Sequence, residues 1–218
     1  MFATDTESSR YALGGVLIEF ESDRVIAIGT DGRRLAKMEG PAQSIDEHQS
    51  GDAMTIVPAR AMQLIDRALS DADAEIQLAS RGNDILVKSP RATIYSRLVE
   101  GRFPKWREVV PKDENMVKLE FTVGPVFAAV RQTAIVTTDE SRGIKFKIAD
   151  GSIELTSSAT EFGDSRVDLP VAYDGSEIVI TLDHRYLGDF LRVLEPQKTV
   201  TFNVKDNDSA AVIETDDG

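Results

Sequence analysis

Two consecutive arginines occupy the position in this sequence that most suggests binding chemistry. The segment GTDGRRLA, residues 29–36, places Arg33 and Arg34 directly after a Thr-Asp-Gly turn and between two apolar runs. Guanidinium groups held at a fixed corner can bind carboxylates or carbonyl oxygens with defined geometry. An ordinary hairpin turn, with Asp31 and Gly32 as turn residues and both arginines solvated, would leave the same pattern. The residues alone keep both interpretations open.

A second set of arginines recurs on two predicted helices, residues 58–69 and 183–195. Each helix carries two arginines seven residues apart, on a face separate from its apolar stripe. Such a repeat favours a surface that meets a polyanion, although solvated helix faces would look alike. The four residues are Arg60, Arg67, Arg185 and Arg192.

The overall charge limits which nucleic-acid binders are possible. The chain has 25 Lys and Arg residues against 37 Asp and Glu residues, and 25 − 37 gives a net charge of −12. This excludes a wholly basic nucleic-acid binder but allows one locally basic face.

Catalytic and metal-binding motifs are not recognisable in the sequence. It has no cysteine, no Gly-x-Ser-x-Gly elbow, no phosphate-binding Lys-Ser/Thr loop and no His-Glu-x-x-His. His48 and His184 lie far apart and are predicted to be surface residues, and the acidic clusters lack a fixed ligand spacing. We therefore expect a protein that is not an enzyme and has no cofactor and no metal.

Two further features bear on where the protein works. The absence of cysteine fits the reducing cytoplasm. No apolar run approaches the roughly 20 residues that a membrane span needs, so we expect no membrane partner.

The elements that must position these residues are mostly strands, with a few short helices, which predicts an α+β fold. Alternating apolar residues predict strands at 16–20, 24–29 and 33–39, and again on either side of the helix 58–69. A segment with two prolines and a charge cluster then separates this half from a second one.

The second half repeats the first. The layout of residues 8–31 returns in 140–161, and that of 55–80 returns in 180–204, where Arg60 corresponds to Arg185 at an offset of 125. We expect two tandem domains, 1–104 and 117–218, joined by a linker at 105–116. Each domain contains two strand–helix–three-strand halves. The first copy lacks its opening strand and helix, and the second lacks its closing strand.

The motifs SSRYALGGV, TDGRRLA, IVPARA, LVEGRFPKW and TTDESRGIKF resemble the bacterial replicative sliding clamp family, the β subunit of DNA polymerase III. The resemblance runs through almost the whole chain in the correct order. It implies a ring homodimer with three similar domains in each subunit, helices lining the DNA-facing hole and sheets outside. Residues 1–218 would then be a fragment that covers most of the middle and third domains.

The resemblance also assigns a role to the arginine corner. It implies a groove on the outer face of the clamp that takes short linear peptides of replicative and other DNA polymerases and of the clamp loader. Glu108 stands where many relatives carry arginine. The positions that match the groove of the family are Leu13, Thr30, Gly32, Arg33, Arg34, Leu35, Pro104 and Val109.

Further positions match the family's DNA-facing loop and subunit interface. The resemblance implies that Arg10 and Tyr11 lie near double-stranded DNA, which a clamp holds weakly and topologically. Ile135 and Val136 match the subunit interface, although core packing at a helix end would suit them too. We therefore expect a processivity clamp. A peptide-binding module and a metal-dependent hydrolase, both unrelated to replication, are the alternatives.

Overall fold

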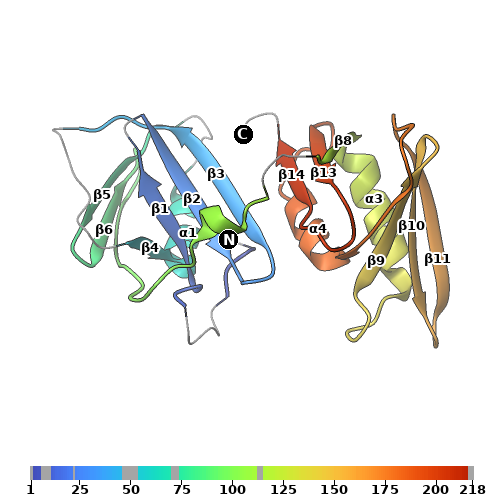
Figure 1. Cartoon of the computed structure of the whole chain (residues 1–218). Helices are drawn as coiled ribbons and strands as arrows, with labels where there is room; N and C mark the ends of the chain where they lie inside the picture. Colours follow the sequence, from blue (N-terminus) through green and yellow to red (C-terminus); the bar gives the residue numbers. More distant parts are fainter. Residues whose placement is uncertain are drawn as a thin grey trace. The chain divides into compact units, whose positions relative to one another are not determined.

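The computed structural model describes residues 2–5, 11–21, 23–45, 54–69, 74–111 and 115–215 of the 218-residue chain. The chain divides into two compact units, unit 1 (Met1–Val109) and unit 2 (Val110–Gly218). Figure 1 shows both units.

Unit 1 contains a four-stranded antiparallel sheet of order β3-β2-β1-β4. Gly15 opens β1 because the backbone of β4 passes close by: a Cβ there would lie 2.6 Å from the Val57 carbonyl oxygen. The strands are β1 (Gly15–Phe20), β2 (Arg24–Thr30), β3 (Leu35–Pro41) and β4 (Thr55–Pro58).

A helix and a second sheet complete unit 1. Helix α1 (Ala59–Ala68) follows β4 directly, with Pro58 as its N-cap, where the missing N–H of proline costs nothing. The three-stranded sheet has the order β5-β6-β7. Its strands are β5 (Gln77–Arg81), β6 (Asp84–Lys88) and β7 (Thr93–Arg97), and a short helix α2 (Trp106–Val109) ends the unit.

The apolar core of unit 1 consists of two clusters. One lies under α1 and includes Val57, Ile65 and Ile85. The other includes Ile28 and Ile56, and it also holds Phe103 and Trp106 from the end of the unit. Trp106 is only 7% exposed, so the start of the segment predicted as a linker packs in unit 1.

Unit 2 has the same architecture and, in addition, a strand and a helix, β8 and α3, before its four-stranded sheet. Its four-stranded sheet has the order β11-β10-β9-β12 and its second sheet the order β14-β13-β8. The elements in chain order are β8 (Val117–Thr122), α3 (Val123–Thr133), the 3-10 helix η1 (Ala134–Val136), β9 (Gly143–Ala149), β10 (Ser152–Ala159), β11 (Gly163–Pro170), β12 (Ile178–Asp183), α4 (His184–Leu191), β13 (Thr199–Val204) and β14 (Val212–Thr215).

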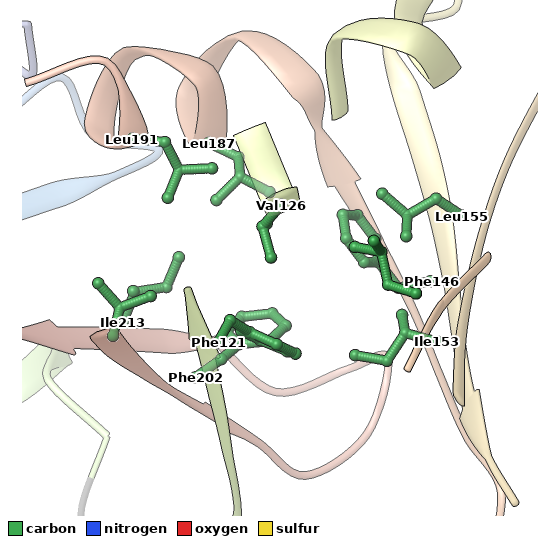
Figure 2. A pocket seen from close by; sticks show the side chains of 11 residues that line it. Phe121, Val126, Phe146, Ile153, Leu155, Leu187, Leu191, Phe202 and Ile213 are labelled. Carbon is green, nitrogen blue, oxygen red and sulfur yellow. The ribbon is translucent and has the colours of Figure 1, made fainter. Parts of the chain in front are cut away.

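One continuous apolar cluster fills unit 2 between its helices and both sheets. It encloses a small cavity of about 20 Å³. Figure 2 shows Val126, Leu187 and Leu191 from the helices facing Phe121, Phe202 and Ile213 across it. Every lining side chain is apolar, so a water molecule there would find no hydrogen-bond partner.

The predicted α+β fold and its internal repeat are confirmed. The order of the four-stranded sheet and the helix that follows its last strand recur between the units, and Gly143 opens β9 as Gly15 opens β1. One boundary differs in an instructive way. The predicted strand 33–39 begins only at Leu35, because Arg33 and Arg34 belong to a turn that the Asp31 side chain closes.

Candidate functional site

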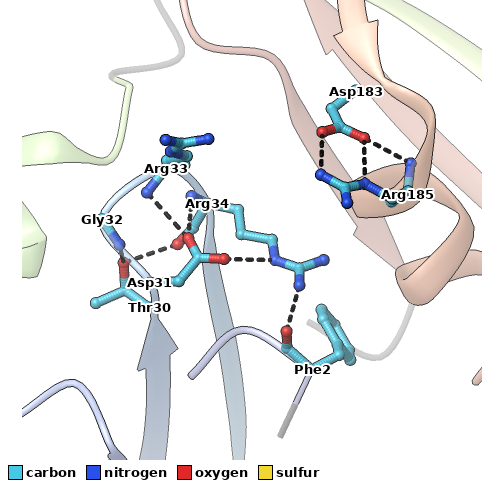
Figure 3. Close-up of polar contacts among 8 residues, drawn as sticks. All are labelled: Phe2, Thr30, Asp31, Gly32, Arg33, Arg34, Asp183 and Arg185. Carbon is cyan, nitrogen blue, oxygen red and sulfur yellow. Dashed lines mark hydrogen bonds and ion pairs between the residues drawn. The ribbon is translucent and has the colours of Figure 1, made fainter. Parts of the chain in front are cut away.

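The arginine corner is a tightly bonded turn between β2 and β3, whose last paired residues are Thr30 and Leu35. The Thr30 hydroxyl accepts a hydrogen bond from the Gly32 N–H at 3.1 Å and donates one to the Arg34 carbonyl oxygen at 2.7 Å. Gly32 has a φ of 85°, which glycine adopts at little cost. Figure 3 shows these contacts.

Asp31 organises both arginines. One of its carboxylate oxygens accepts hydrogen bonds from the backbone N–H groups of Arg33 and Arg34, each at 3.0 Å. The other oxygen accepts from Nε of Arg34, also at 3.0 Å. Burial alone would raise the pKa of the Asp31 carboxyl, but these donors and the guanidinium charge outweigh it and lower the pKa.

The two arginines have different environments. The Arg34 side chain is 18% exposed, donates to the Phe2 carbonyl oxygen and stacks over the Phe2 ring. Arg33 is exposed, and no ion pair of its guanidinium is found among the described residues. Arg34 therefore supports the turn, whereas Arg33 presents a guanidinium group to solvent.

Several of the predicted groove residues lie around the second core cluster of unit 1. Leu35 is half-buried against this cluster, which contains Phe103 and Trp106, the residues on either side of the Pro104–Lys105 dipeptide. Leu13 is 5% exposed and follows Ala12, a member of the cluster. Leu35 at the end of the turn, Ala12, Phe103 and Trp106 therefore pack together in one apolar cluster.

The end of unit 1 adds an exposed apolar residue and several charges. Val109 closes α2 and is 64% exposed. Glu108 is exposed and its carboxylate pairs with Lys105 at 2.9 Å. Arg107 pairs with Glu19 at 2.7 Å and lies over the ring of Trp106. These contacts hold α2 against β1.

The arginines of α1 and α4 differ in their pairing. Arg60 and Arg67 are exposed on α1, and no ion pair is found for them in the described part of the chain. Arg185 is bonded to the Asp183 carboxylate through Nε and an Nη atom, which raises its pKa. Arg192 lies 3.6 Å from Asp189. Arg185 lies at the start of α4 and Arg192 is its C-cap, because the helix predicted over 183–195 spans only His184–Leu191. The cations at the two ends of α4 are thus partly neutralised by neighbouring carboxylates.

The remaining predicted positions fall in two other places. Tyr11 is 38% exposed, and Arg10 lies outside the described residues. In unit 2, Ile135 is 77% exposed and Val136 is half-buried, both in η1. An exposed isoleucine at this position is not core packing, which leaves its apolar surface available to a partner.

His184 anchors the end of this exposed segment. The Thr137 hydroxyl donates to the Ala134 carbonyl oxygen at 2.8 Å and therefore accepts from Nε2–H of His184 at 3.1 Å. Burial lowers the pKa of His184, which favours a neutral ring at pH 7. His184 is half-buried rather than a free surface residue, and His48 lies outside the described residues.

Sequence reasoning missed two side chains that support the turn. Phe2 stacks on Arg34, and Trp106 anchors residues 103–106 through its packing and its Nε1–H bond to Glu19 at 3.3 Å. No local pattern points to either contact, because each joins segments far apart in the sequence. The role of Asp31 could have been predicted from the sequence, because an aspartate at the start of a turn commonly accepts hydrogen bonds from the backbone N–H groups that follow it.

Metal and membrane features are absent from the residues that the structure describes. No cluster of three or more His, Cys, Asp or Glu side chains among them is arranged to hold a metal ion. In the same residues, no helix is both long and apolar enough to cross a membrane.

Comparison with known families assigns both units. Residues 1–105 match the model for the DNA polymerase III beta subunit, central domain, and residues 107–217 match the model for the C-terminal domain of the same subunit. The matches occur in chain order and divide close to the boundary between the two compact units.

Individual relatives agree with the family models. The chain is 28% identical over 212 residues to the beta sliding clamp of Chlamydia pneumoniae, covering 97% of this chain and 56% of the relative. It is 29% identical over 218 residues to that of Pseudomonas putida, covering 98% and 57%. The solved DNA polymerase III subunit beta of Pseudomonas aeruginosa aligns with a TM-score of 0.88 at 27% identity, covering 100% of this chain and 58% of that one. This chain therefore spans a little over half the length of these relatives.

Proposed function

Because this chain belongs to the DNA polymerase III beta subunit family, we propose that it serves as part of a DNA sliding clamp. Such a clamp is a non-catalytic processivity factor: it encircles duplex DNA and holds the replicative polymerase there. The observation that carries the proposal is the ordered match of both compact units to two successive domains of one clamp subunit. Units 1 and 2 would be the middle and third clamp domains, working in the cytoplasm.

The turn of unit 1 forms the core of the proposed peptide site. Leu35, Pro104 and Val109 supply accessible apolar surface, whereas Leu13 is buried and would support the site from within unit 1. The exposed Arg33 guanidinium suits a peptide carboxylate or carbonyl oxygen. Thr30, Gly32 and Arg34 act indirectly by holding the turn through their hydrogen bonds. The partners proposed for this site are short linear segments of polymerases and of the clamp loader.

Contact with DNA is proposed for the arginine faces of the helices. Arg60 and Arg67 on α1 are exposed and suit phosphates. Arg185 in α4 and Arg192 at its C-cap are weaker contributors because of their carboxylate neighbours. Tyr11 and Arg10 are assigned to the same role by family resemblance. A ring that encloses DNA needs only weak, salt-sensitive contacts of this kind.

Ring assembly is proposed to use the exposed η1 segment of unit 2. Ile135 and Val136 would meet the partner subunit of the ring homodimer, and the 77% exposure of Ile135 supports this role. The hydrogen bond between His184 and Thr137 holds the end of this segment in place.

Peptide affinity tests the proposed function. A fluorescent peptide that carries the clamp-binding segment of a bacterial replicative polymerase should bind the chain, and a scrambled peptide should not. Leu35→Ala should weaken binding by about 1–2 kcal/mol, as the loss of an anchor contact does. Met38→Ala is the matched control, because Met38 lies on the same strand as Leu35 but, three residues further along, on the opposite face of the sheet. Equal affinity for both peptides, or equal effects of both substitutions, would contradict the assignment.

A further inference from the structure

The three-stranded sheet β5-β6-β7 of unit 1 has one face in the core and one face in solvent. Ile85 and Val87 of β6 are each 2% exposed and belong to the core cluster under α1. Side chains alternate along a strand, so Leu86 between them points to the other face, where it is 44% exposed. Leu86 lies opposite Ala79 of β5 and Tyr95 of β7. We call these three residues the apolar row of the outer face.

Cationic side chains lie on both sides of the apolar row. In the row on one side, Asp84 lies opposite Arg81 and Arg97, and in the row on the other side Lys88 lies opposite two uncharged polar residues. The three cations are exposed, and no ion pair of theirs is found in the part of the chain that the structure describes. Three cations and one carboxylate make this face positive on a chain whose net charge is −12.

Tyr95 is the most exposed side chain of the apolar row, at 64%. Its hydroxyl donates a hydrogen bond to the Asp84 carboxylate at 2.8 Å, which restrains the ring on the outer face and satisfies part of that carboxylate. Tyrosine and arginine are the residue types that most often dominate binding at protein interfaces, and here they lie in neighbouring rows. The outer face therefore has the composition of a binding surface.

The equivalent sheet of unit 2 carries charges in its middle row. Strands β5 and β13 correspond, because each is the first strand after the helix that follows the edge strand of a four-stranded sheet. In the sheet β14-β13-β8, Thr201 lies opposite Glu214 and Glu120, and both glutamates are exposed. This architecture thus folds with carboxylates at this place. The exposed leucine and tyrosine of unit 1 are therefore not a requirement of the fold.

We propose that the outer face of β5-β6-β7 is a docking surface for an extended acidic–apolar polypeptide segment. Successive rows of this face are about 7 Å apart, because every second residue of a strand faces the same side. An extended peptide spaces its own side chains in the same way. An apolar side chain would lie on Leu86 and Tyr95, and carboxylates two residues before and after it would reach Arg97 on one side and Lys88 on the other.

Single-stranded nucleic acid suits this face less well than a peptide does. Bases bind to sheets by stacking on aromatic rings, and the apolar row offers the one ring of Tyr95 beside the aliphatic Leu86 and Ala79. A nucleic acid also carries a phosphate at every nucleotide, so it would bring negative charge close to Asp84. A peptide can carry carboxylates only where Arg97 and Lys88 lie.

An NMR titration of the isotope-labelled 218-residue chain tests this surface. The probe is the peptide acetyl-Ser-Glu-Ser-Phe-Ser-Glu-Ser-amide, which has a glutamate two residues before and after a phenylalanine. Titration to about 10 mM would nearly saturate a site with a Kd of about 1 mM. The probe should shift the amide signals of Leu86, Tyr95 and Arg97. The same peptide with lysines in place of its glutamates should leave these signals unchanged.

Two matched pairs of variants separate the apolar and the charged contacts. Leu86→Gln should weaken binding of the probe at least about fivefold, whereas Leu64→Gln, at a 50% exposed position of α1, should not change it. Arg97→Glu should also weaken binding at least about fivefold. Lys205→Glu makes the same change in net charge at an exposed position of unit 2 and should have no effect. Arg97 is exposed, so its variant decides the test if Leu86→Gln does not fold.

Four results would overturn the proposal. The first is an absence of shifts in β5, β6 and β7 at the highest probe concentration. The second is shifts confined to the turn from Thr30 to Leu35, which would mean that the probe binds the peptide site proposed above. The third is equal effects of the two members of each matched pair. The fourth is a stronger response of the same signals to a 15-nucleotide thymidine oligonucleotide, which would make single-stranded nucleic acid the occupant.

Discussion

Two adjacent arginines in the sequence have different roles in the structure. The Arg34 guanidinium is held by the Asp31 carboxylate and the Phe2 carbonyl oxygen, whereas Arg33 faces solvent. The sequence pattern cannot show which of the two arginines bonds the turn, because this depends on the Asp31 carboxylate and on Phe2, which lies far away in the sequence. The peptide-binding role proposed for this corner therefore rests on Arg33 and Leu35, with Arg34 as their support.

Asp31→Asn should destabilise unit 1 by about 1–2 kcal/mol at pH 7. The substitution keeps an acceptor for backbone N–H groups but removes the charge that bonds Arg34. The pKa of Asp31 is lowered in the folded state, so its contribution is complete above the unfolded pKa of about 4 and is lost as the pH falls through the folded pKa.

Urea unfolding at several pH values measures this effect. The difference between the unsubstituted chain and Asp31→Asn should be largest near pH 7 and should shrink below about pH 4. Asp164→Asn, at an exposed position of β11, is the control and should change stability little. A difference that grows on acidification would rule out the proposed role of the Asp31 carboxylate.

At the scale of elements, helix α3 packs in the core of unit 2, which contains a small apolar cavity. Val126 borders the cavity of unit 2, whereas Val130, one turn further along, is 1% exposed and does not line it. Val126→Ile should stabilise the chain by about 0.5–1 kcal/mol, because its added methylene fills space that is now empty. Val130→Ile should destabilise by about 1–3 kcal/mol, because its methylene has no such space. Thermal unfolding of both variants measures this, and equal shifts would show that the cavity does not govern packing here.

The two arginine helices should contribute unequally to DNA binding. Arg60→Glu with Arg67→Glu should abolish low-salt association with duplex DNA, because both side chains are exposed on α1. Arg185→Glu with Arg192→Glu should have a smaller effect, because Asp183 and Asp189 already compensate these charges.

Fluorescence anisotropy with labelled duplex DNA over a salt series measures both pairs. Affinity of the unsubstituted chain should fall steeply with salt, and the slope should decrease when phosphate contacts are lost. A larger loss from the α4 pair would reverse the assignment of the main DNA contact.

At the scale of the whole molecule, the repeated pattern of strands and helices made the fold predictable. Alternating runs such as VIAI and the recurrence of Arg60 at Arg185 are local and periodic, and they indicated two copies of one α+β architecture. The contacts of Trp106 and Phe2 were not predictable, since each joins distant segments and depends on tertiary packing. The family resemblance predicted which residues form the site. The structure distinguishes exposed residues such as Arg33 from residues such as Thr30 and Arg34, whose hydrogen bonds hold the turn.

The most direct test of the clamp assignment is to map the peptide site on the isotope-labelled 218-residue chain by NMR. The clamp-binding peptide of a bacterial polymerase is titrated in, with its scrambled form as control. We predict chemical-shift changes that cluster at Leu13, at the turn from Thr30 to Leu35, and at Pro104 and Val109. No change, equal changes with the scrambled peptide, or changes confined to other parts of the chain would contradict the proposed peptide site.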